Sequence, residues 1–156
     1  MTVAHQGPTV AVGDMEAAAD WMRDQGHRVS AARRLVLEAL FAAPGPISAE
    51  QIAEGLDGRL PLSDPASVYR NLETLERLGL VRHFHAGHGA GMYALARDQE
   101  YVSCRSCGEV RALGVDRFDV VRKVIRRELG ITAQFDHFPI VGLCRRCEGS
   151  PRREER

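Results

Sequence analysis

Two matched cysteine motifs near the C-terminus constrain this chain more than any other feature. The four cysteines of the 156-residue sequence form two C-x-x-C pairs, Cys104 with Cys107 and Cys144 with Cys147. The two thiolates of such a pair can converge on one side of a tight turn, and zinc takes four such ligands in a tetrahedron. We therefore predict a structural zinc site with four cysteine ligands, whose completed coordination leaves no open position for catalysis.

Thiol-redox chemistry and buried free cysteines are the alternatives for the same four residues. The start of the sequence lacks the positive charge and the long apolar segment of an export signal, so we expect a cytoplasmic protein without stable disulfides. No apolar run approaches the length of a membrane span, and we expect no membrane association. Thiols that resist alkylation until a chelator is added would indicate the structural site.

Residues 14–96 have the element order of a winged helix-turn-helix. Apolar residues at helical spacing predict four helices, beginning near residues 14, 31, 48 and 64. Ser30 is expected to cap the second helix, Ser48 and Gln51 form a capping box for the third, and Pro65 suits the first turn of the fourth. Two β-like runs, "LVRHFH" and "MYALA", follow with a glycine-rich connection, which predicts a hairpin as the wing.

The residues from Tyr101 onward predict an α/β arrangement around the cysteines. "YVSC" and "EVRALGV" are typical of short strands, and "AQFDHFPIVGLC" predicts a further strand leading into the second pair. "DRFDVVRKVIRREL" predicts an amphipathic helix that ends at Gly130. We expect its inner face to be formed by Phe118, Val121, Ile125 and Leu129. The fold class expected for the whole chain is therefore α+β.

The helix that begins at Pro65 is the candidate DNA-recognition helix. Its first turns carry Ser67, Tyr69 and Arg70 opposite an apolar face, as groove contact requires. Arg28 and Arg33, near the start of the second helix, are candidates for holding the phosphate backbone. The net charge of the chain is zero, so contacts to double-stranded DNA would have to come from such local arginines. An ordinary solvated helix face is the alternative for these side chains.

The chain resembles the ferric uptake regulator family of metal-responsive bacterial repressors. The segments that carry the resemblance are "GHRVSAARRLVLEAL", "SAEQIAEGL", "ASVYRNLETLERLGLVRHF", "YVSCRSCGEV" and "HFPIVGLCRRC". The resemblance implies a homodimer with structural Zn²⁺ on the four cysteines and a separate regulatory metal. The residues themselves predict flexible tails at 1–13 and 149–156 and a domain boundary near Arg97. The resemblance implies that 14–96 is a winged-helix DNA-binding domain and 97–148 a dimerisation and metal-binding domain.

The sequence departs from the family in the expected sensory ligands. Members usually carry a histidine-rich run before the first C-x-x-C, and here that stretch is "RDQEY"; a further family histidine is replaced by Pro46. His85, His88 and His137 with Glu100, and His83 nearby, form the remaining candidate set for Fe²⁺, Zn²⁺, Mn²⁺ or Ni²⁺. The alternative is that the wing histidines meet phosphate or solvent and that His137 is a core residue.

We therefore expect a metal-dependent transcriptional regulator. It would be a repressor that binds palindromic operators as a dimer and controls metal homeostasis or oxidative-stress genes. We expect neither an enzyme nor a binder of small organic substrates. The competing hypotheses are a zinc-dependent or thiol-redox enzyme, and a zinc-ribbon module that binds protein without sensing metal.

Overall fold

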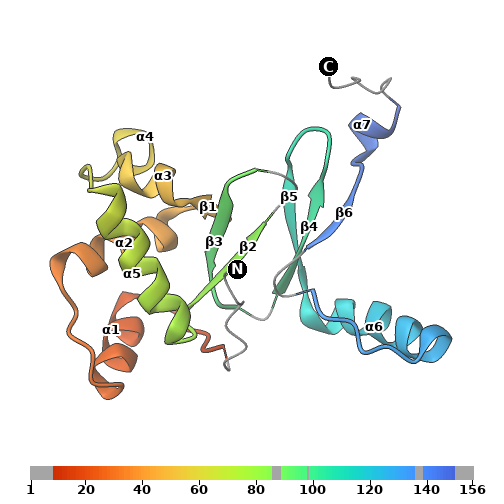
Figure 1. Cartoon of the computed structure of the whole chain (residues 1–156), viewed down its shortest axis with the longest axis horizontal. Helices are drawn as coiled ribbons and strands as arrows, with labels where there is room; N and C mark the ends of the chain where they lie inside the picture. Colours follow the sequence, from red (N-terminus) through yellow and green to blue (C-terminus); the bar gives the residue numbers. More distant parts are fainter. Residues whose placement is uncertain (1–8, 86–88, 98, 136–138, 150–156) are drawn as a thin grey trace.

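The chain folds around two three-stranded sheets, one in each half of the sequence. The computed structural model describes residues 9–85, 89–97, 99–135 and 139–149. The strand order is β1-β3-β2 in the first sheet and β5-β4-β6 in the second. Figure 1 shows the helices α1–α5 on one side of the molecule and α6 with α7 on the other, with the sheets between them. The mixed helix and strand content confirms the predicted α+β class.

The helices of the N-terminal half begin where the capping residues of the sequence predict. Ser30 accepts a hydrogen bond from the Arg33 amide, and Ser48 with Gln51 forms the predicted capping box. Asp64 caps the helix that begins with Pro65. The helices are α1 (Met15–Asp24), α2 (Ala31–Ala42), α3 (Ala49–Ala53) and α5 (Pro65–Arg77).

One large apolar core holds these helices together. Leu37 of α2 and Leu72 and Leu75 of α5 are fully buried, because the apolar residues of an amphipathic helix face the core. The polar residue Thr74 of α5 is also buried, with 7% of its surface exposed. Its hydroxyl donates to the Arg70 carbonyl at 3.0 Å, which satisfies the polar group without water.

The wing is a hairpin of β2 (Val81–His85) and β3 (Gly91–Leu95), which pair antiparallel. A two-residue strand that the sequence did not predict, β1 (Ile47–Ser48), pairs with the other edge of β3. Because Ile47 lies opposite Tyr93, β1 ties the start of α3 to the wing.

The second sheet has β4 at its centre. β4 (Gln99–Cys104) pairs antiparallel with β5 (Val110–Gly114) and parallel with β6 (Ile140–Gly142). The predicted strand before the second cysteine pair is therefore confirmed only over its last part. The long helix α6 (Val115–Leu129) ends at Gly130, whose φ of 68° lies in the left-handed region. A short helix, α7 (Arg145–Glu148), carries the last cysteine.

The prediction that Phe118, Val121, Ile125 and Leu129 form a buried inner face of α6 is wrong for most of this face in the single protomer. Phe118 is buried, but Val121 is 37% exposed and Leu129 is 67% exposed. The apolar stripe exists, but the described residues of the protomer leave most of it uncovered. No helix in the described parts of the chain has both the length and the apolar character needed to cross a membrane.

A left-handed turn, α4 (Gly55–Gly58), separates α3 from the segment before α5. All four residues have positive φ, including 52° for Leu56 and 58° for Asp57. A Cβ on Gly55 would overlap the backbone oxygen of Leu60, whereas a Cβ on Gly58 would meet nothing within 4 Å.

We predict that Gly55→Ala destabilises the chain more than Gly58→Ala. Both variants force alanine into the left-handed region, which costs about 1–2 kcal/mol, but only Gly55→Ala adds a clash with backbone. Urea denaturation of the two variants measures the difference. Equal free energies of unfolding would contradict the proposed role of the close approach to Leu60.

Candidate metal centre and nucleic-acid interface

The parallel pairing of β4 with β6 brings the two cysteine pairs together. Cys104 is the last residue of β4 and lies opposite Gly142 of β6, so the two strands end side by side. The first pair then turns through Gly108, whose amide donates to the Cys104 carbonyl at 2.9 Å and whose φ is 73°. Cys144 opens α7, which positions Cys147 one turn later. The two C-x-x-C turns expected from the sequence thus lie close together at one end of the sheet.

The four thiols have the separations that a tetrahedral metal site requires. Their sulfur atoms all lie within 4.8 Å of one another, and the Sγ atoms of Cys107 and Cys144 are 3.9 Å apart. Zn–S bonds of about 2.3 Å in a tetrahedron place sulfurs about 3.8 Å apart. The backbone amide of Cys144 also donates to the Cys104 sulfur at 3.4 Å, which favours the thiolate. The cluster therefore fits zinc in size and in donor chemistry.

The pKa values of Cys104, Cys144 and Cys147 are shifted in different directions. Hydrogen bonds from the amides of Cys107 and Cys144 lower the pKa of Cys104 to about 6. The amide of Cys147 lowers the pKa of Cys144. The Ser106 hydroxyl acts to lower the pKa of Cys147, but the neighbouring cysteines outweigh it and raise that pKa to about 11. The raised pKa of Cys147 disfavours its thiolate, and a divalent metal among the sulfurs would favour it.

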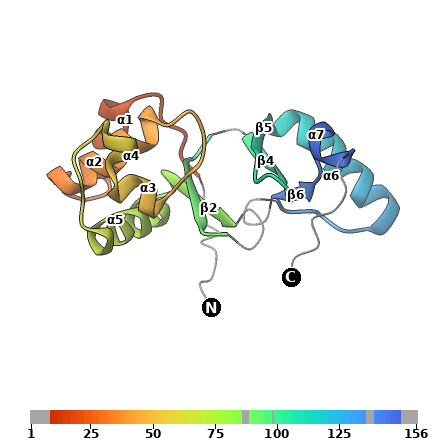
Figure 2. The same cartoon turned by 90° about the horizontal axis from the view of Figure 1, so that it is seen from above.

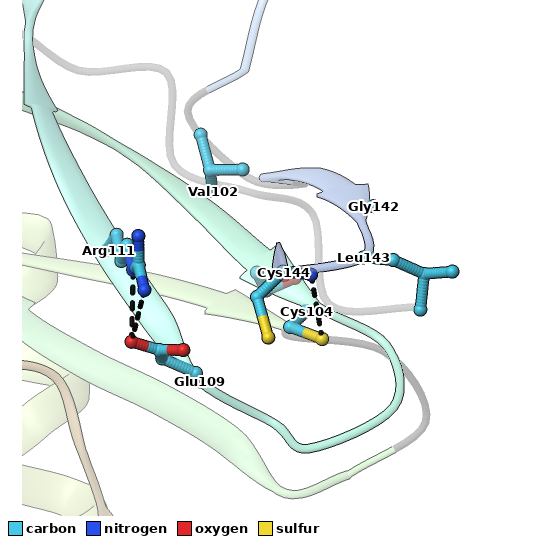
Figure 3. A pocket seen from close by; sticks show the side chains of 8 residues that line it. Val102, Cys104, Glu109, Arg111, Gly142, Leu143 and Cys144 are labelled. Atoms are coloured by element: carbon cyan, nitrogen blue, oxygen red, sulfur yellow. Dashed lines mark hydrogen bonds and ion pairs between the residues drawn. The ribbon is translucent and has the colours of Figure 1, made fainter. Parts of the chain in front are cut away.

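A hollow of about 180 Å³ borders the cluster (Figure 3). It is lined by Val102, Cys104 and Cys144 among others, and by Glu109 with Arg111. The Glu109 carboxylate is paired with Arg111 at 2.9 Å and with Arg146 at 3.3 Å, so it does not compete for the metal. Of the four cysteines, Cys104 and Cys144 line the hollow, and its lining adds no further cysteine or histidine ligand.

The candidate regulatory ligands are only partly within the described structure. His88 and His137 lie outside the described residues. His83 and His85 both lie on β2, with ring centroids 4.9 Å apart, and the His83 ring stacks on Tyr93 at 4.7 Å. Among the described residues, the four cysteines are the one close group of three or more potential ligands.

Glu100 is buried between two arginines that the sequence analysis did not single out. It is 5% exposed, and its two carboxylate oxygens accept from Arg82 at 2.9 Å and from Arg122 at 2.6 Å. A partial signal was present for Arg122, which follows the buried Phe118 by four residues and so shares its helix face. No comparable signal marked Arg82, because its partner lies in another sheet.

The candidate nucleic-acid contacts lie on α5 and near the start of α2. Arg70 is exposed, Ser67 is half-buried, and Tyr69 is 46% exposed. The Tyr69 hydroxyl donates to Glu50 of α3 at 2.6 Å. This hydrogen bond raises the pKa of Tyr69 and lowers that of Glu50. The first turns of α5 therefore carry a tyrosine whose hydroxyl is fixed by a hydrogen bond, Tyr69, and an arginine whose guanidinium is exposed, Arg70.

The side chain of Arg33 in α2 is hydrogen-bonded to Asn71 in α5. Its Nε donates to Asn71 Oδ1 at 3.1 Å and its Nη1 donates to the Arg28 carbonyl at 2.8 Å. Asn71 is 8% exposed and donates in turn to the Ser67 carbonyl. Arg33 thus orients the helix that carries Arg70, while the Arg28 side chain remains exposed.

Comparison with known proteins places this arrangement among bacterial regulators. The model of the ferric uptake regulator family matches residues 24–137. The chain is 24% identical to the peroxide operon regulator of Bacillus subtilis (strain 168), over 88% of this chain and 96% of that protein. The structure of the Helicobacter pylori ferric uptake regulator has a TM-score of 0.69 at 16% identity, covering 88% of this chain and 96% of that one. A zinc uptake regulator complexed with zinc and DNA has a TM-score of 0.56 at 22% identity, covering 86% and 92%.

We predict that Cys104→Ser loses the bound zinc and unfolds the half built on β4, β5 and β6. Zinc binding at a structural site contributes directly to folding, by about 10–16 kcal/mol in small zinc domains. Zinc content per chain and amide exchange of β4 measure the two effects. The matched control is Ser103→Ala, because the buried Ser103 hydroxyl has no hydrogen-bond partner among the described residues. A Cys104→Ser variant with one zinc per chain and normal exchange would contradict the site.

Proposed function

The chain belongs to the ferric uptake regulator family, and on that premise we propose that it is a zinc-stabilised, metal-dependent transcriptional regulator that binds double-stranded DNA as a homodimer. The observation that carries this proposal is the family match over residues 24–137, which spans both the candidate recognition helix α5 and the first cysteine pair. A winged helix and a four-thiol site in one chain are the two parts that such a regulator needs. We propose a cytoplasmic location and repression of metal-homeostasis or oxidative-stress genes, in line with the peroxide operon regulator it resembles.

We propose that α5 enters the major groove and that Ser67, Tyr69 and Arg70 face the bases. Arg70 can donate two hydrogen bonds to a guanine edge, and its side chain is exposed near the start of the helix. Arg28 and Arg33 are proposed to contact phosphate, which fixes the register of the helix. A structurally similar zinc uptake regulator is known in complex with zinc and DNA, which supports DNA binding by this fold.

The homodimer is supported by the apolar surface that the described part of the protomer leaves uncovered. The exposed residues are concentrated on α6, after it and on the strand that leads to Cys144: Val120, Val121, Val124, Leu129, Ile131, Val141 and Leu143. A second copy that covers this surface would bury them, as homodimer interfaces do. Two-fold symmetry then presents two copies of α5 to a palindromic operator.

Regulation is proposed to come from a second divalent metal, Fe²⁺, Zn²⁺, Mn²⁺ or Ni²⁺, at the wing. His83 and His85 are adjacent on β2 and can supply imidazole ligands. His88 and His137, which the sequence suggests as further ligands, are proposed to complete the set. Glu100 is left out of this set because both of its oxygens are held by arginines.

An enzymatic activity is not proposed. A zinc ion on four thiols has no open position for water or substrate. The same completed coordination argues against thiol-redox catalysis, since that chemistry needs an accessible thiolate. No small organic substrate is required by the proposed function.

We predict that Arg70→Ala weakens binding to an operator by about 1–3 kcal/mol and relaxes the base preference at one position. The operator is selected from random duplexes with the wild-type protein, and binding is measured by fluorescence anisotropy. Arg77→Ala is the control, because Arg77 lies on the same face of α5 two turns later and donates to Thr74. Unchanged affinity and base preference for Arg70→Ala would contradict base readout by this residue.

We predict that the dimer with one zinc per chain gains operator affinity on addition of a second divalent metal. The expected gain is about 5- to 150-fold, the usual range for coupling between two sites. His85→Ala should lose the gain, whereas His27→Ala, far from the wing in sequence, should keep it. Equal affinity with and without each of the four metals would exclude the regulatory site and leave DNA binding standing.

A further inference from the structure

The wing is packed against the second sheet by side chains from both halves of the chain. The Phe84 ring of β2 stacks on the Tyr101 ring of β4, with centroids 4.7 Å apart and planes 19° apart. Phe84 is 1% exposed and Tyr101 is 4% exposed. With Ala94 they form a small buried cluster that is separate from the main core. Figure 2 shows the hairpin strand β2 between the α1–α5 helices and the β4–β6 sheet.

An ion network lies beside this ring pair. Arg82 of β2 donates to the Gln99 carbonyl at 2.6 Å and to Glu100 Oε2 at 2.9 Å. Arg122 of α6 donates to Glu100 Oε1 at 2.6 Å and to Asp119 at 3.1 Å. The side chains of Arg82 and Glu100 are only 10% and 7% exposed. The Glu100 carboxylate therefore joins the wing to the helix of the second half.

The charges of this network balance without a metal ion at Glu100. A buried carboxylate requires cationic or hydrogen-bonding partners, and here two guanidinium groups occupy both of its oxygens. A metal bound to Glu100 would displace one arginine and leave a buried guanidinium without its carboxylate, which is unfavourable. Arginine is protonated at any physiological pH, so the arginines stay cationic without a cofactor.

We propose that Arg82, Glu100 and Arg122 form a metal-independent clasp that sets the orientation of the winged helix relative to the second sheet. The proposal rests on the proposed DNA-binding function and deepens it. The clasp and the Phe84–Tyr101 stack lower the free energy of one arrangement of the two halves, and hence raise its population. The dimer with zinc on its four thiols alone already holds this arrangement and binds its operator. A second metal then adjusts the affinity and is not needed to close the junction.

Arg82→Gln is the principal test. The variant keeps the Arg122–Glu100 pair, so the second half still folds around a paired carboxylate. With one zinc per chain, we expect operator affinity to fall by about 5- to 150-fold, with unchanged zinc content and dimerisation. Small-angle X-ray scattering should show a larger radius of gyration, and amide exchange in β2 should accelerate. Glu100→Gln removes the carboxylate partner of both arginines and should also weaken operator binding and accelerate amide exchange in β2. Arg82→Lys should have a smaller effect than Arg82→Gln, because lysine keeps the charge but not the two-pronged geometry.

Arg97→Gln is the matched control, since Arg97 is an exposed arginine in the connection between β3 and β4. It should leave scattering, exchange and affinity unchanged. Scattering and β2 exchange of Arg82→Gln that match the wild type would overturn the clasp, whether or not the protein binds DNA. A wild-type dimer that binds its operator only after a second metal is added would overturn the metal-independent arrangement and leave the proposed function intact. Failure of the wild type to bind DNA with any metal would instead refute the proposed function, while scattering and exchange still decide on the clasp.

Discussion

The position of β4, which pairs with β5 on one side and with β6 on the other, is the constraint on which both the cysteine cluster and the junction with the wing depend. β4 is the central strand of its sheet, and its end meets the end of β6 because the two strands run in the same direction. That geometry brings Cys104 near Cys144. At its other end, β4 carries Glu100 and Tyr101 into the junction with the wing. One strand of six residues therefore connects the metal centre to the winged helix.

Local rules accounted for most of the N-terminal half and for the cysteine cluster. A capping or first-turn residue affects only the few residues that follow it in the chain. The helices that begin at Ser30, Ser48 and Pro65 were therefore predictable from sequence. The cysteine pairs were predictable for a similar reason, because each C-x-x-C turn carries its own geometry. β1 escaped prediction, since a strand of two residues has no periodicity and exists only through its pairing with β3.

Pairings between distant elements could not be read from the sequence. Arg82 and Glu100 are 18 residues apart and lie in different sheets, so neither strand alone indicates that a carboxylate will be buried there. The prediction that the apolar face of α6 is buried was wrong because a covering surface is missing among the described residues of the protomer. The apolar spacing of Val121 and Leu129 was correct, but no described part of the protomer supplies the surface that would cover them. A periodic pattern identifies a face to be buried and does not identify what buries it.

The stretch "RDQEY", where the resemblance to the family led us to expect histidines, has a structural role in this chain at Gln99, Glu100 and Tyr101. The Gln99 carbonyl accepts from Arg82, and its side-chain amide donates to the Tyr101 hydroxyl at 2.8 Å. Glu100 faces two arginines and Tyr101 faces Phe84. Each of these three residues contacts a partner that organises the junction, and none of them has imidazole chemistry. The stretch therefore takes part in the proposed clasp, in which the guanidinium groups of Arg82 and Arg122 supply the positive charge that faces Glu100.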